Sequence, residues 1–365
     1  MKNIGQKQLI FFNKDNPPSS DAKLAVCDPS SKHNPLNKFV GNKSAVRRLC
    51  RAAFTAFGNY NHVCPFNFSL IGPASSGKTT LAKLFAELLG LPFVEIDPSS
   101  IHELNCILSR IGGALENTKN DWGQSLELFN YEEKVLLPPV VVFIDEVHLL
   151  NDDIIHGLLK ATEPKDRTMQ TENGWIVDTS NVTWIIATTE RGLLFDAFDT
   201  RFMKINLGLY TAKEIAKIIQ DNFPDIPENI CNFISKLIGK IPREALSFTK
   251  EIELEFKMNG GDWRQALNIV AQDNQIDKFG LSKQRLDVLK ALSRGPISKN
   301  RMATILSCKE EELVKFIMPS LLIPTEDSEP MVTIVSKGYK ITESGIQQLE
   351  KRKLSHKGRD FLLKE

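Results

Sequence analysis

The segment LIGPASSGKTTLAKLF, residues 70–85, constrains the fold of this 365-residue chain most strongly. An apolar run ends in a loop of small residues, and a Lys-Thr pair then opens a second apolar run with helical periodicity. The loop fits the pattern GxxxxGK[ST], in which small residues let backbone N–H groups turn inward around phosphates. The sequence therefore predicts a strand, a phosphate-binding loop and a helix, in that order.

The residues of this loop are expected to bind ATP and Mg²⁺. Lys78 should reach the β- and γ-phosphates, and the Thr79 hydroxyl should hold Mg²⁺. The dipole of the helix that begins here favours the negative charge of the phosphates. The expected nucleotide-binding residues of this segment are Gly72, Pro73, Ala74, Ser75, Ser76, Gly77, Lys78, Thr79 and Thr80.

A second apolar strand, VVVFID, ends on two carboxylates at the edge of the predicted sheet where the phosphate loop also lies. Asp145 suits the Mg²⁺ shell, and Glu146 suits the orientation and polarisation of an attacking water. An alternative interpretation is that the pair caps the N-terminus of a helix. The strand directly before the pair favours the catalytic interpretation.

Three polar residues further along the chain are candidates for contact with the γ-phosphate. Thr189 follows the strand VTWIIAT, although threonine at a strand end is commonly explained by β-propensity alone. Arg201, before a short strand, could reach the γ-phosphate of a neighbouring subunit if the chain forms a ring. Arg243 opens a helix in KIPREAL and could sense the nucleotide from another side.

Alternating helices and near-continuous apolar strands between residues 39 and 207 predict a parallel sheet covered on both faces. We expect strands at 66–71, 92–97, 140–145, 182–188 and 203–207, and helices at 41–57, 79–89, 101–115 and 153–162. The dipeptide Asn173-Gly174 between alternating apolar residues predicts a type I′ hairpin.

After residue 207 the predicted strands stop. Helices at 211–222, 227–238, 242–258 and 262–272 would form a small all-α domain. Helices at 282–292, 298–306 and 309–322 precede VTIVSKGYKIT, two short strands around a Lys-Gly turn, which indicates a winged helix. The fold class is therefore α/β, with a P-loop core, a helical lid and a C-terminal winged helix. The expected domains are an extended or disordered arm at 1–36, the ATPase domain at 37–207, the lid at 208–279, the winged helix at 280–355 and a tail at 356–365.

Charge is unevenly distributed along the chain. Residues 281–365 hold 16 Lys and Arg against 11 Asp and Glu, whereas the whole chain has a net charge of only +1. This excess favours a nucleic-acid partner at the C-terminal end. Lys337 and Lys340 of the wing are the expected DNA contacts. Glutamates at 310–312 oppose close phosphate approach by the presumed recognition helix, so we expect backbone contact without base readout; protein contact is the alternative.

Composition excludes several classes of protein. The chain is 42% hydrophobic and 25% charged, as in soluble globular proteins. No apolar run approaches the ~20 residues that span a bilayer, and the N-terminus does not resemble a signal peptide. The six cysteines contain no CxxC pair, so we interpret them as reduced thiols. We expect a cytoplasmic protein with no membrane partner.

In this order and spacing the motifs resemble those of AAA+ ATPases. The segments GPASSGKTTLA, VFIDEVHLLN, IIATTERGLLFDAFDTRF, LYTAKEIAKII, KIPREAL and FGLSKQRLDVLKAL are similar to the RuvB family of branch-migration motors over roughly residues 36–350. The resemblance implies a homo-hexameric ring that hydrolyses ATP, translocates duplex DNA and drives migration of a Holliday (four-way) junction. It implies the sensor-1 role for Thr189, the trans arginine-finger role for Arg201 and the sensor-2 role for Arg243.

The resemblance also assigns the adenine pocket. The segment KFVGN, with Phe39 and Val40, matches the part of the family that lines this pocket, and Tyr210 matches a position that flanks the base. The family uses a hairpin to dock its junction-binding partner, which implies a RuvA-like protein at the 167–178 hairpin of this chain. Because this hairpin looks shorter and carries Trp175 beside its turn, packing on its own domain is the alternative.

Two further departures from the family pattern indicate a divergent member, such as one encoded by a phage. Ala74-Ser75 replaces Pro-Gly in the phosphate loop, and Glu190 replaces an arginine. The expected function is a DNA-translocating motor. The alternative is a AAA+ switch or loader that acts on DNA without processive movement. A DNA-bound adaptor with a purely structural ATPase site is disfavoured by the intact Glu146 and Arg201.

Overall fold

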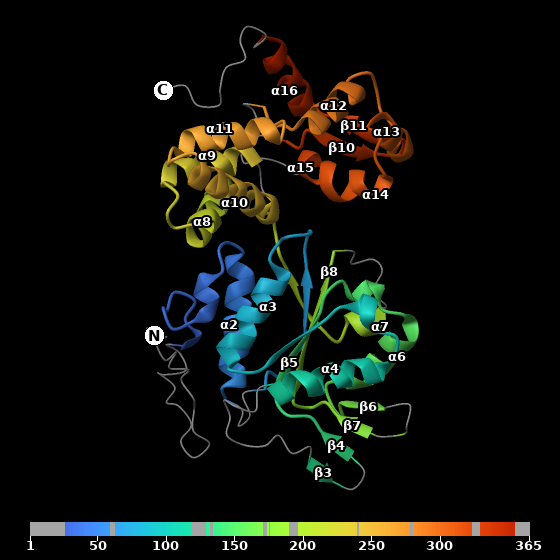
Figure 1. Ribbon diagram of the computed structural model, residues 1–365. Coiled ribbons are helices and arrows are strands. Elements are labelled where there is room, and N and C mark those ends of the chain that lie inside the picture. The colour runs from blue at the N-terminus through green and yellow to red at the C-terminus, as the bar shows by residue number, and fades with distance from the viewer. Residues whose placement is uncertain are drawn as a thin grey trace. The chain divides into compact units, whose positions relative to one another are not determined.

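The computed structural model of the chain describes residues 26–58, 63–117, 129–131, 134–170, 174, 176–189, 196–238, 241–277, 280–322 and 329–354. It divides into two compact units, Met1–Gly208 and Leu209–Glu365 (Figure 1). Each unit is described by itself.

The first unit is built on a sheet of five parallel strands in the order β2-β5-β8-β1-β9. The strands are β1 (Phe68–Ile71), β2 (Phe93–Ile96), β5 (Val140–Ile144), β8 (Val182–Thr188) and β9 (Met203–Asn206). The predicted parallel sheet is confirmed. Its order places β1, β5 and β8 next to one another, so the loops after these strands meet at one edge of the sheet.

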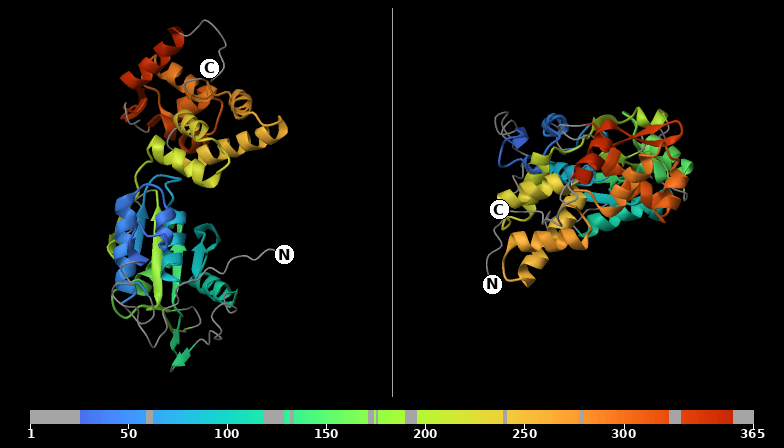
Figure 2. Two further views of the ribbon diagram at one scale, coloured as in Figure 1. Left: turned by 90° about the vertical axis from the view of Figure 1, so that its left-hand side faces the viewer. Right: turned by 90° about the horizontal axis from the view of Figure 1, so that it is seen from above.

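Helices cover both faces of this sheet, as predicted. They are α2 (Lys43–Ala56), α3 (Lys78–Leu89), α4 (Leu104–Asn117), α6 (Asp152–Ala161) and the short α7 (Asp196–Asp199), with 3₁₀ turns η1 (Pro35–Lys38), η2 (Pro98–Ser100) and η3 (Val147–Leu149). Figure 2 shows α2 and α3 on one face and α4 on the other. Along β5 the side chains alternate between two cores: Phe143 packs with α2 and α3, whereas Val142 and Ile144 pack with α4 and α6. This two-sided burial explains the continuous apolar run of the strand.

A second, smaller sheet includes two strands that the sequence analysis missed. Its order is β3-β4-β7-β6, and its strands are β3 (Phe129–Tyr131), β4 (Lys134–Leu136), β6 (Thr168–Gln170) and β7 (Ile176–Asp178). β4 pairs in parallel with β7. The predicted β6–β7 hairpin is therefore not an isolated arm, because a strand from another part of the chain covers one of its edges.

The hairpin itself is present, but its register differs from the prediction. A two-residue turn at Asn173-Gly174 would pair Gln170 with Val177, whereas the structure pairs Gln170 with Ile176. The predicted type I′ turn itself is not tested, because Asn173 lies outside the described residues. Of the residues between the strands, only Gly174 is described, and it has the positive φ of 82° that a glycine allows. Trp175 lies outside the described residues.

The end of the predicted disordered arm is in fact packed. Leu36 is fully buried in the α2–α3 core, and Cys27 joins the same core. The Asn34 amide donates to the Cys50 sulfur and to the backbone oxygen of Asp28. Residues 26–36 hold only three apolar residues, Val26, Cys27 and Leu36, and these show no periodicity that would reveal the packing. Residues 1–25 lie outside the described part of the chain.

The second unit begins with the four expected lid helices, α8 (Ala212–Asn222), α9 (Glu228–Ile238), α10 (Pro242–Met258) and α11 (Trp263–Asp273). They enclose an apolar core that contains Ile215, Ile234 and Phe248. Thr211 and Glu214 form a reciprocal capping box at the start of α8, and this satisfies two backbone donors at the start of the helix.

The winged helix follows, with α12 (Lys283–Leu292), α13 (Lys299–Ile305), the antiparallel strands β10 (Val332–Val335) and β11 (Gly338–Ile341), and α16 (Glu343–Leu354). The single helix predicted at 309–322 is wrong. It is divided into α14 (Glu310–Glu312), a π-helical turn (Leu313–Ile317) and α15 (Pro319–Leu322). Pro319 has no N–H to continue the α-helical hydrogen bonds, which explains a break at this position.

The wing turns at Ser336-Lys337 and not at the expected Lys-Gly pair, because Val335 pairs with Gly338. Lys337 and Lys340 are both exposed, as a contact with DNA would require. Glu310 forms an ion pair of 3.5 Å with Lys299 of α13.

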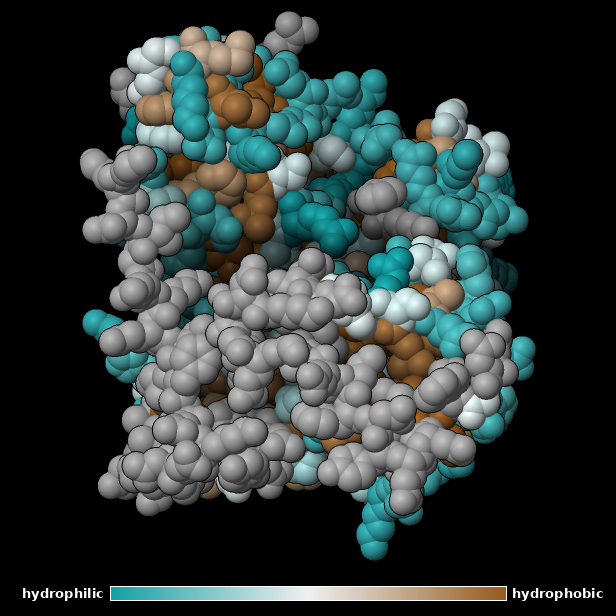
Figure 3. All heavy atoms as spheres, turned by 60° about the horizontal axis from the view of Figure 1, so that its bottom comes forward, coloured by the Kyte–Doolittle hydropathy of each residue, from teal (hydrophilic) through white to brown (hydrophobic). Residues whose placement is uncertain are grey.

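The described surface mixes hydrophilic and hydrophobic side chains, as Figure 3 shows for one face. The most exposed large hydrophobic residues are Leu149, Ile334 and Met258, which lie on separate elements. Isolated apolar residues of this kind are normal on protein surfaces. No helix in the described ranges is long and apolar enough to cross a membrane.

Gly338 is the position of the wing that tolerates a side chain least. A Cβ there would lie 2.3 Å from the Ile297 backbone oxygen, and φ is 119°. We predict that Gly338→Ala destabilises the wing by about 2 kcal/mol, because the clash adds to the strained φ. Hydrogen exchange of the β10 and β11 amides in the full chain measures this loss of local stability.

The matched control is Gly295→Ala, where φ is also positive (135°) but no atom lies within 4 Å of the added Cβ. Equal effects of the two substitutions would contradict the role of close packing against Ile297.

Candidate nucleotide-binding site

The phosphate loop joins β1 to α3, as the sequence predicted, and α3 begins at Lys78. Two loop residues have left-handed backbone conformations, Ser75 with φ 62° and Gly77 with φ 87°. Ser75 occupies one of the positions where the family pattern of the sequence analysis differs from this chain. Its positive φ gives the physical reason why glycine suits this position.

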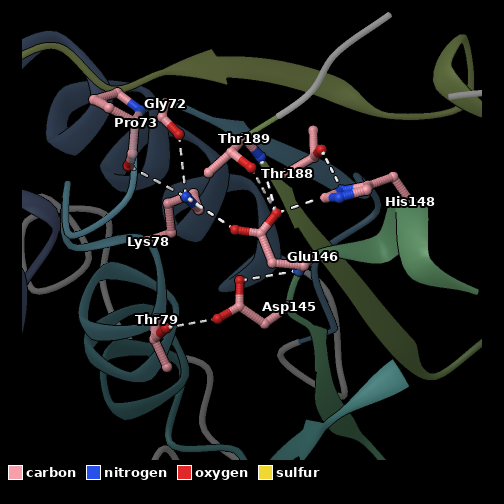
Figure 4. Close-up of polar contacts among 9 residues, drawn as sticks. All are labelled: Gly72, Pro73, Lys78, Thr79, Asp145, Glu146, His148, Thr188 and Thr189. Carbon is pink, nitrogen blue, oxygen red and sulfur yellow. Dashed lines mark hydrogen bonds and ion pairs between the residues drawn. The ribbon is translucent and has the colours of Figure 1, made fainter. Parts of the chain in front are cut away.

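Lys78 points into the loop that it follows (Figure 4). Its ammonium group donates to the backbone oxygens of Gly72 and Pro73, at 3.1 and 3.3 Å, and the residue is only 6% exposed. The same group lies 3.9 Å from Oε1 of Glu146. A phosphate in the loop would replace these carbonyl contacts with charge-assisted hydrogen bonds.

Asp145 and Thr79 offer the oxygen ligands that suit Mg²⁺. Oδ2 of Asp145 accepts a hydrogen bond of 3.5 Å from the Thr79 hydroxyl. Burial raises the pKa of Asp145, and the neighbouring Glu146 charge raises it further, while Lys78 lowers it. A bound cation would instead lower the pKa of Asp145, because it favours the ionised carboxylate. A hydroxyl and one carboxylate fit Mg²⁺, which takes few protein ligands when phosphates and water supply the others.

Glu146 is held by the end of the neighbouring strand. Its Oε2 accepts hydrogen bonds of 3.0 Å from both the backbone N–H and the hydroxyl of Thr189. Its backbone is left-handed (φ 44°, ψ 51°), which is unusual for a non-glycine residue. The structure therefore brings the two candidate residues Glu146 and Thr189 together, with Thr189 bonded to the Glu146 carboxylate.

His148, a further residue of this network, was missed by the sequence analysis. Nδ1 of His148 lies 3.0 Å from the Thr188 hydroxyl and 3.4 Å from Oε2 of Glu146. Thr188 is fully buried at the end of β8. The sequence does show a polar residue two positions after Glu146. What that residue contacts becomes clear only from the pairing of β5 with β8.

The segment assigned to the adenine pocket lies between η1 and α2. Phe39 is partly buried against the α2–α3 core, and Val40 is also partly buried. Asn42, the last residue of this segment, accepts a hydrogen bond of 2.7 Å from the Gly208 N–H and thereby ties the segment to the chain after β9. Tyr210 belongs to the second unit and is buried in the lid core.

The two candidate arginines lie in different units. Arg201 donates to Oε1 of Glu163 and to the Ala197 backbone oxygen, both at 3.0 Å. Neither partner belongs to the phosphate loop. Arg243 is the second residue of α10 and is exposed. Glu190 lies outside the described residues.

Comparison with known proteins agrees with this geometry. The model of the ATPase family associated with various cellular activities (AAA) matches residues 68–209, which include the phosphate loop, Glu146 and Thr189. The Holliday junction branch migration complex subunit RuvB of Ehrlichia chaffeensis is 28% identical over 343 residues, covering 88% of this chain and 94% of that protein. RuvB of Thermotoga petrophila is 26% identical over 307 residues, covering 79% and 84%.

Solved structures show the same fold. The Thermotoga maritima RuvB Holliday junction branch migration motor superposes with a TM-score of 0.66 at 23% identity, covering 87% of this chain and 97% of that chain. A point mutant of the same protein gives a TM-score of 0.67. The chain is therefore a divergent homologue of the RuvB proteins, with an AAA ATPase domain.

The left-handed Ser75 generates a prediction about the loop. Ser75→Val should weaken ATP binding at least about fivefold, because a β-branched residue at this φ costs more than about 1 kcal/mol. Ser75→Gly should bind ATP at least as tightly as the parent. Isothermal titration with ATP and Mg²⁺ measures both affinities. Equal affinity of the valine and glycine variants would show that the conformation of Ser75 does not limit binding.

The raised pKa of Asp145 predicts a gain in stability on neutralisation. Above its folded-state pKa the ionised carboxylate destabilises the folded chain, since the unfolded chain ionises more readily. Asp145→Asn should therefore raise the thermal unfolding midpoint at pH 7 without nucleotide or Mg²⁺. The gain should shrink as the pH falls through the carboxyl range, where Asp145 is protonated in both states. A lower midpoint for the variant at pH 7 would contradict the assignment.

Proposed function

We propose that this divergent RuvB homologue is an ATP-hydrolysing motor that moves duplex DNA and drives migration of Holliday junctions. One observation carries the ATPase assignment: the Glu146 carboxylate lies between Lys78 and Thr189, at 3.9 and 3.0 Å. Thr79 and Asp145 lie beside it at the same sheet edge. The homologues carry the DNA part of the proposal, because their names describe Holliday junction branch migration.

The residues at this edge of the sheet have separate roles in ATP hydrolysis. Lys78 and the loop amides bind the phosphates, while Thr79 and Asp145 hold Mg²⁺. When bound, Mg²⁺ neutralises charge that develops on the phosphates. Glu146 orients the attacking water and accepts its proton. The Thr189 hydroxyl, which donates to Glu146 in this structure, is placed to donate to the γ-phosphate instead.

The ring-forming part of the proposal concerns two arginines. We assign Arg201 to the nucleotide of a neighbouring subunit in a homo-hexamer and Arg243 to the nucleotide of its own subunit. The contacts of Arg201 with Glu163 and Ala197, away from the phosphate loop, are compatible with action in trans. In the adenine pocket we assign Phe39, Val40 and Tyr210.

DNA contact is assigned to the wing. Lys337 and Lys340 are exposed there, and neither forms an ion pair among the described residues. Glu310, Glu311 and Glu312 give the adjacent helix a negative N-terminus, which disfavours close approach to phosphates. The wing is therefore assigned to contact with the DNA backbone, without recognition of a particular sequence.

One observation favours the alternative of a switch or loader. The β6–β7 hairpin, proposed as the docking site for a RuvA-like protein, is joined by β4 in the smaller sheet. One edge of the hairpin is thus covered, so its surface differs from that of a two-stranded arm. A chain that docks elsewhere could use ATP to assemble on DNA without continuous movement.

The proposal predicts the outcome of one set of assays. ATP turnover is measured without DNA, with linear duplex and with a synthetic four-way junction, while strand dissociation is followed in the same samples. We expect DNA to raise turnover and the junction to separate into duplexes. Glu146→Gln should retain ATP binding but lower turnover at least about a hundredfold, because it removes the general base.

ATP turnover without junction dissociation would contradict the motor function and support the alternative of a switch or loader. Turnover that no DNA stimulates would contradict both functions on DNA. Loss of ATP binding in the wild-type chain would contradict the nucleotide site itself.

A further inference from the structure

His148 is a partly buried polar residue beside the proposed catalytic base, and the functions assigned above give it no role. It follows Glu146 by two residues, within η3, and its side chain is only 10% exposed. Its Nδ1 faces two oxygens, the Thr188 hydroxyl at 3.0 Å and Oε2 of Glu146 at 3.4 Å (Figure 4). Such a residue at a site of chemistry is a candidate for holding the base in position.

The tautomer of the ring follows from these neighbours. Glu146 is an acceptor when ionised, so a lone pair on Nδ1 at 3.4 Å would face the carboxylate unfavourably. A hydrogen on Nδ1 faces two oxygen atoms that can both accept it. A ring that carries a hydrogen on Nδ1 is therefore the form that fits, and this N–H lies between Thr188 and Glu146.

The hydrogen-bond capacity of Thr189 shows why a second group is needed. Its hydroxyl has one hydrogen, which is now directed at Oε2 of Glu146. In the proposed sensor role the same hydrogen is donated to the γ-phosphate. It cannot do both, so Oε2 then keeps the Thr189 backbone N–H and loses the hydroxyl.

We propose that His148 is a positioning residue that holds Oε2 of Glu146 when the Thr189 hydroxyl turns to the phosphate. With Oε2 fixed on this side, Oε1, which faces Lys78 at 3.9 Å, is the oxygen that accepts the proton of the attacking water. The inference rests on the proposed ATPase function and assigns a further residue to that site.

Thr188 makes the arrangement rigid. It ends β8, is fully buried, and accepts from Nδ1 at the shorter of the two distances. The ring is thus anchored to the central sheet on one side and lies against Glu146 on the other. A side chain fixed in this way restricts Glu146 without contact with the nucleotide.

The test compares variants of His148 in steady-state ATP hydrolysis and in direct titration with ATP and Mg²⁺. His148→Phe keeps a ring of similar size but removes the N–H. We expect it to lower kcat about tenfold while the Kd for ATP changes less than about twofold. His148→Asn places an amide N–H at the level of Nδ1 and should return kcat to within about threefold of the parent.

A second variant tests the anchor. Thr188→Val should lower kcat by itself, and Thr188→Val combined with His148→Phe should be no slower than His148→Phe alone, because both act through one contact. The matched control is His102→Phe, an exposed histidine before α4, which should leave kcat unchanged.

An unchanged kcat in His148→Phe would overturn the inference. So would equal losses in His148→Phe and His148→Asn, because the N–H would then not matter. A parallel rise in the Kd for ATP would show a structural role and would overturn it too. Failure of the proposed function is a separate result, since the wild-type chain itself would then show no ATP turnover.

Discussion

The site depends on the parallel pairing of β1, β5 and β8 at the centre of the main sheet. In this order the three strands end side by side, so a phosphate loop, two carboxylates and two threonines meet although they are far apart in sequence. Burial on both faces fixes the register, because a shift by one residue would exchange the side chains of the two cores. The apolar packing of the sheet therefore determines the positions of the site residues.

The site carries local costs that a bound nucleotide and cation would offset. Ser75 and Glu146 are both left-handed, and each such conformation costs about 1 kcal/mol or more. Burial raises the pKa of Asp145, and the Lys78 ammonium group donates to a backbone oxygen of its own loop. A phosphate and a divalent cation supply the opposite charges and the acceptors that this arrangement lacks.

Elements with a strong apolar pattern or a turn signal were predictable from the sequence, whereas β3, β4 and the break at Pro319 were not. β5 and β8 are buried on both faces, so their composition alone identifies them. β3 and β4 have three residues each, and β4 pairs with a strand some 40 residues later in the chain, which no local pattern encodes. The break at Pro319 was hidden by helical periodicity on both sides, and the hairpin register depended on pairing that the Asn-Gly signal does not determine.

The same distinction applies to the site. Sequence motifs identified four site residues, because the chemistry of each motif follows from the order of its own residues. These four are Lys78, Thr79, Asp145 and Glu146. Their partners depend on register: Ile144 pairs with Ile186, which places the position of Glu146 level with that of Thr188 on the next strand. The carboxylate of Glu146, which follows β5, and the hydroxyl of Thr188, which ends β8, can therefore both contact the imidazole of His148. This contact depends on how the two strands pair in the sheet, so neither motif by itself identifies His148.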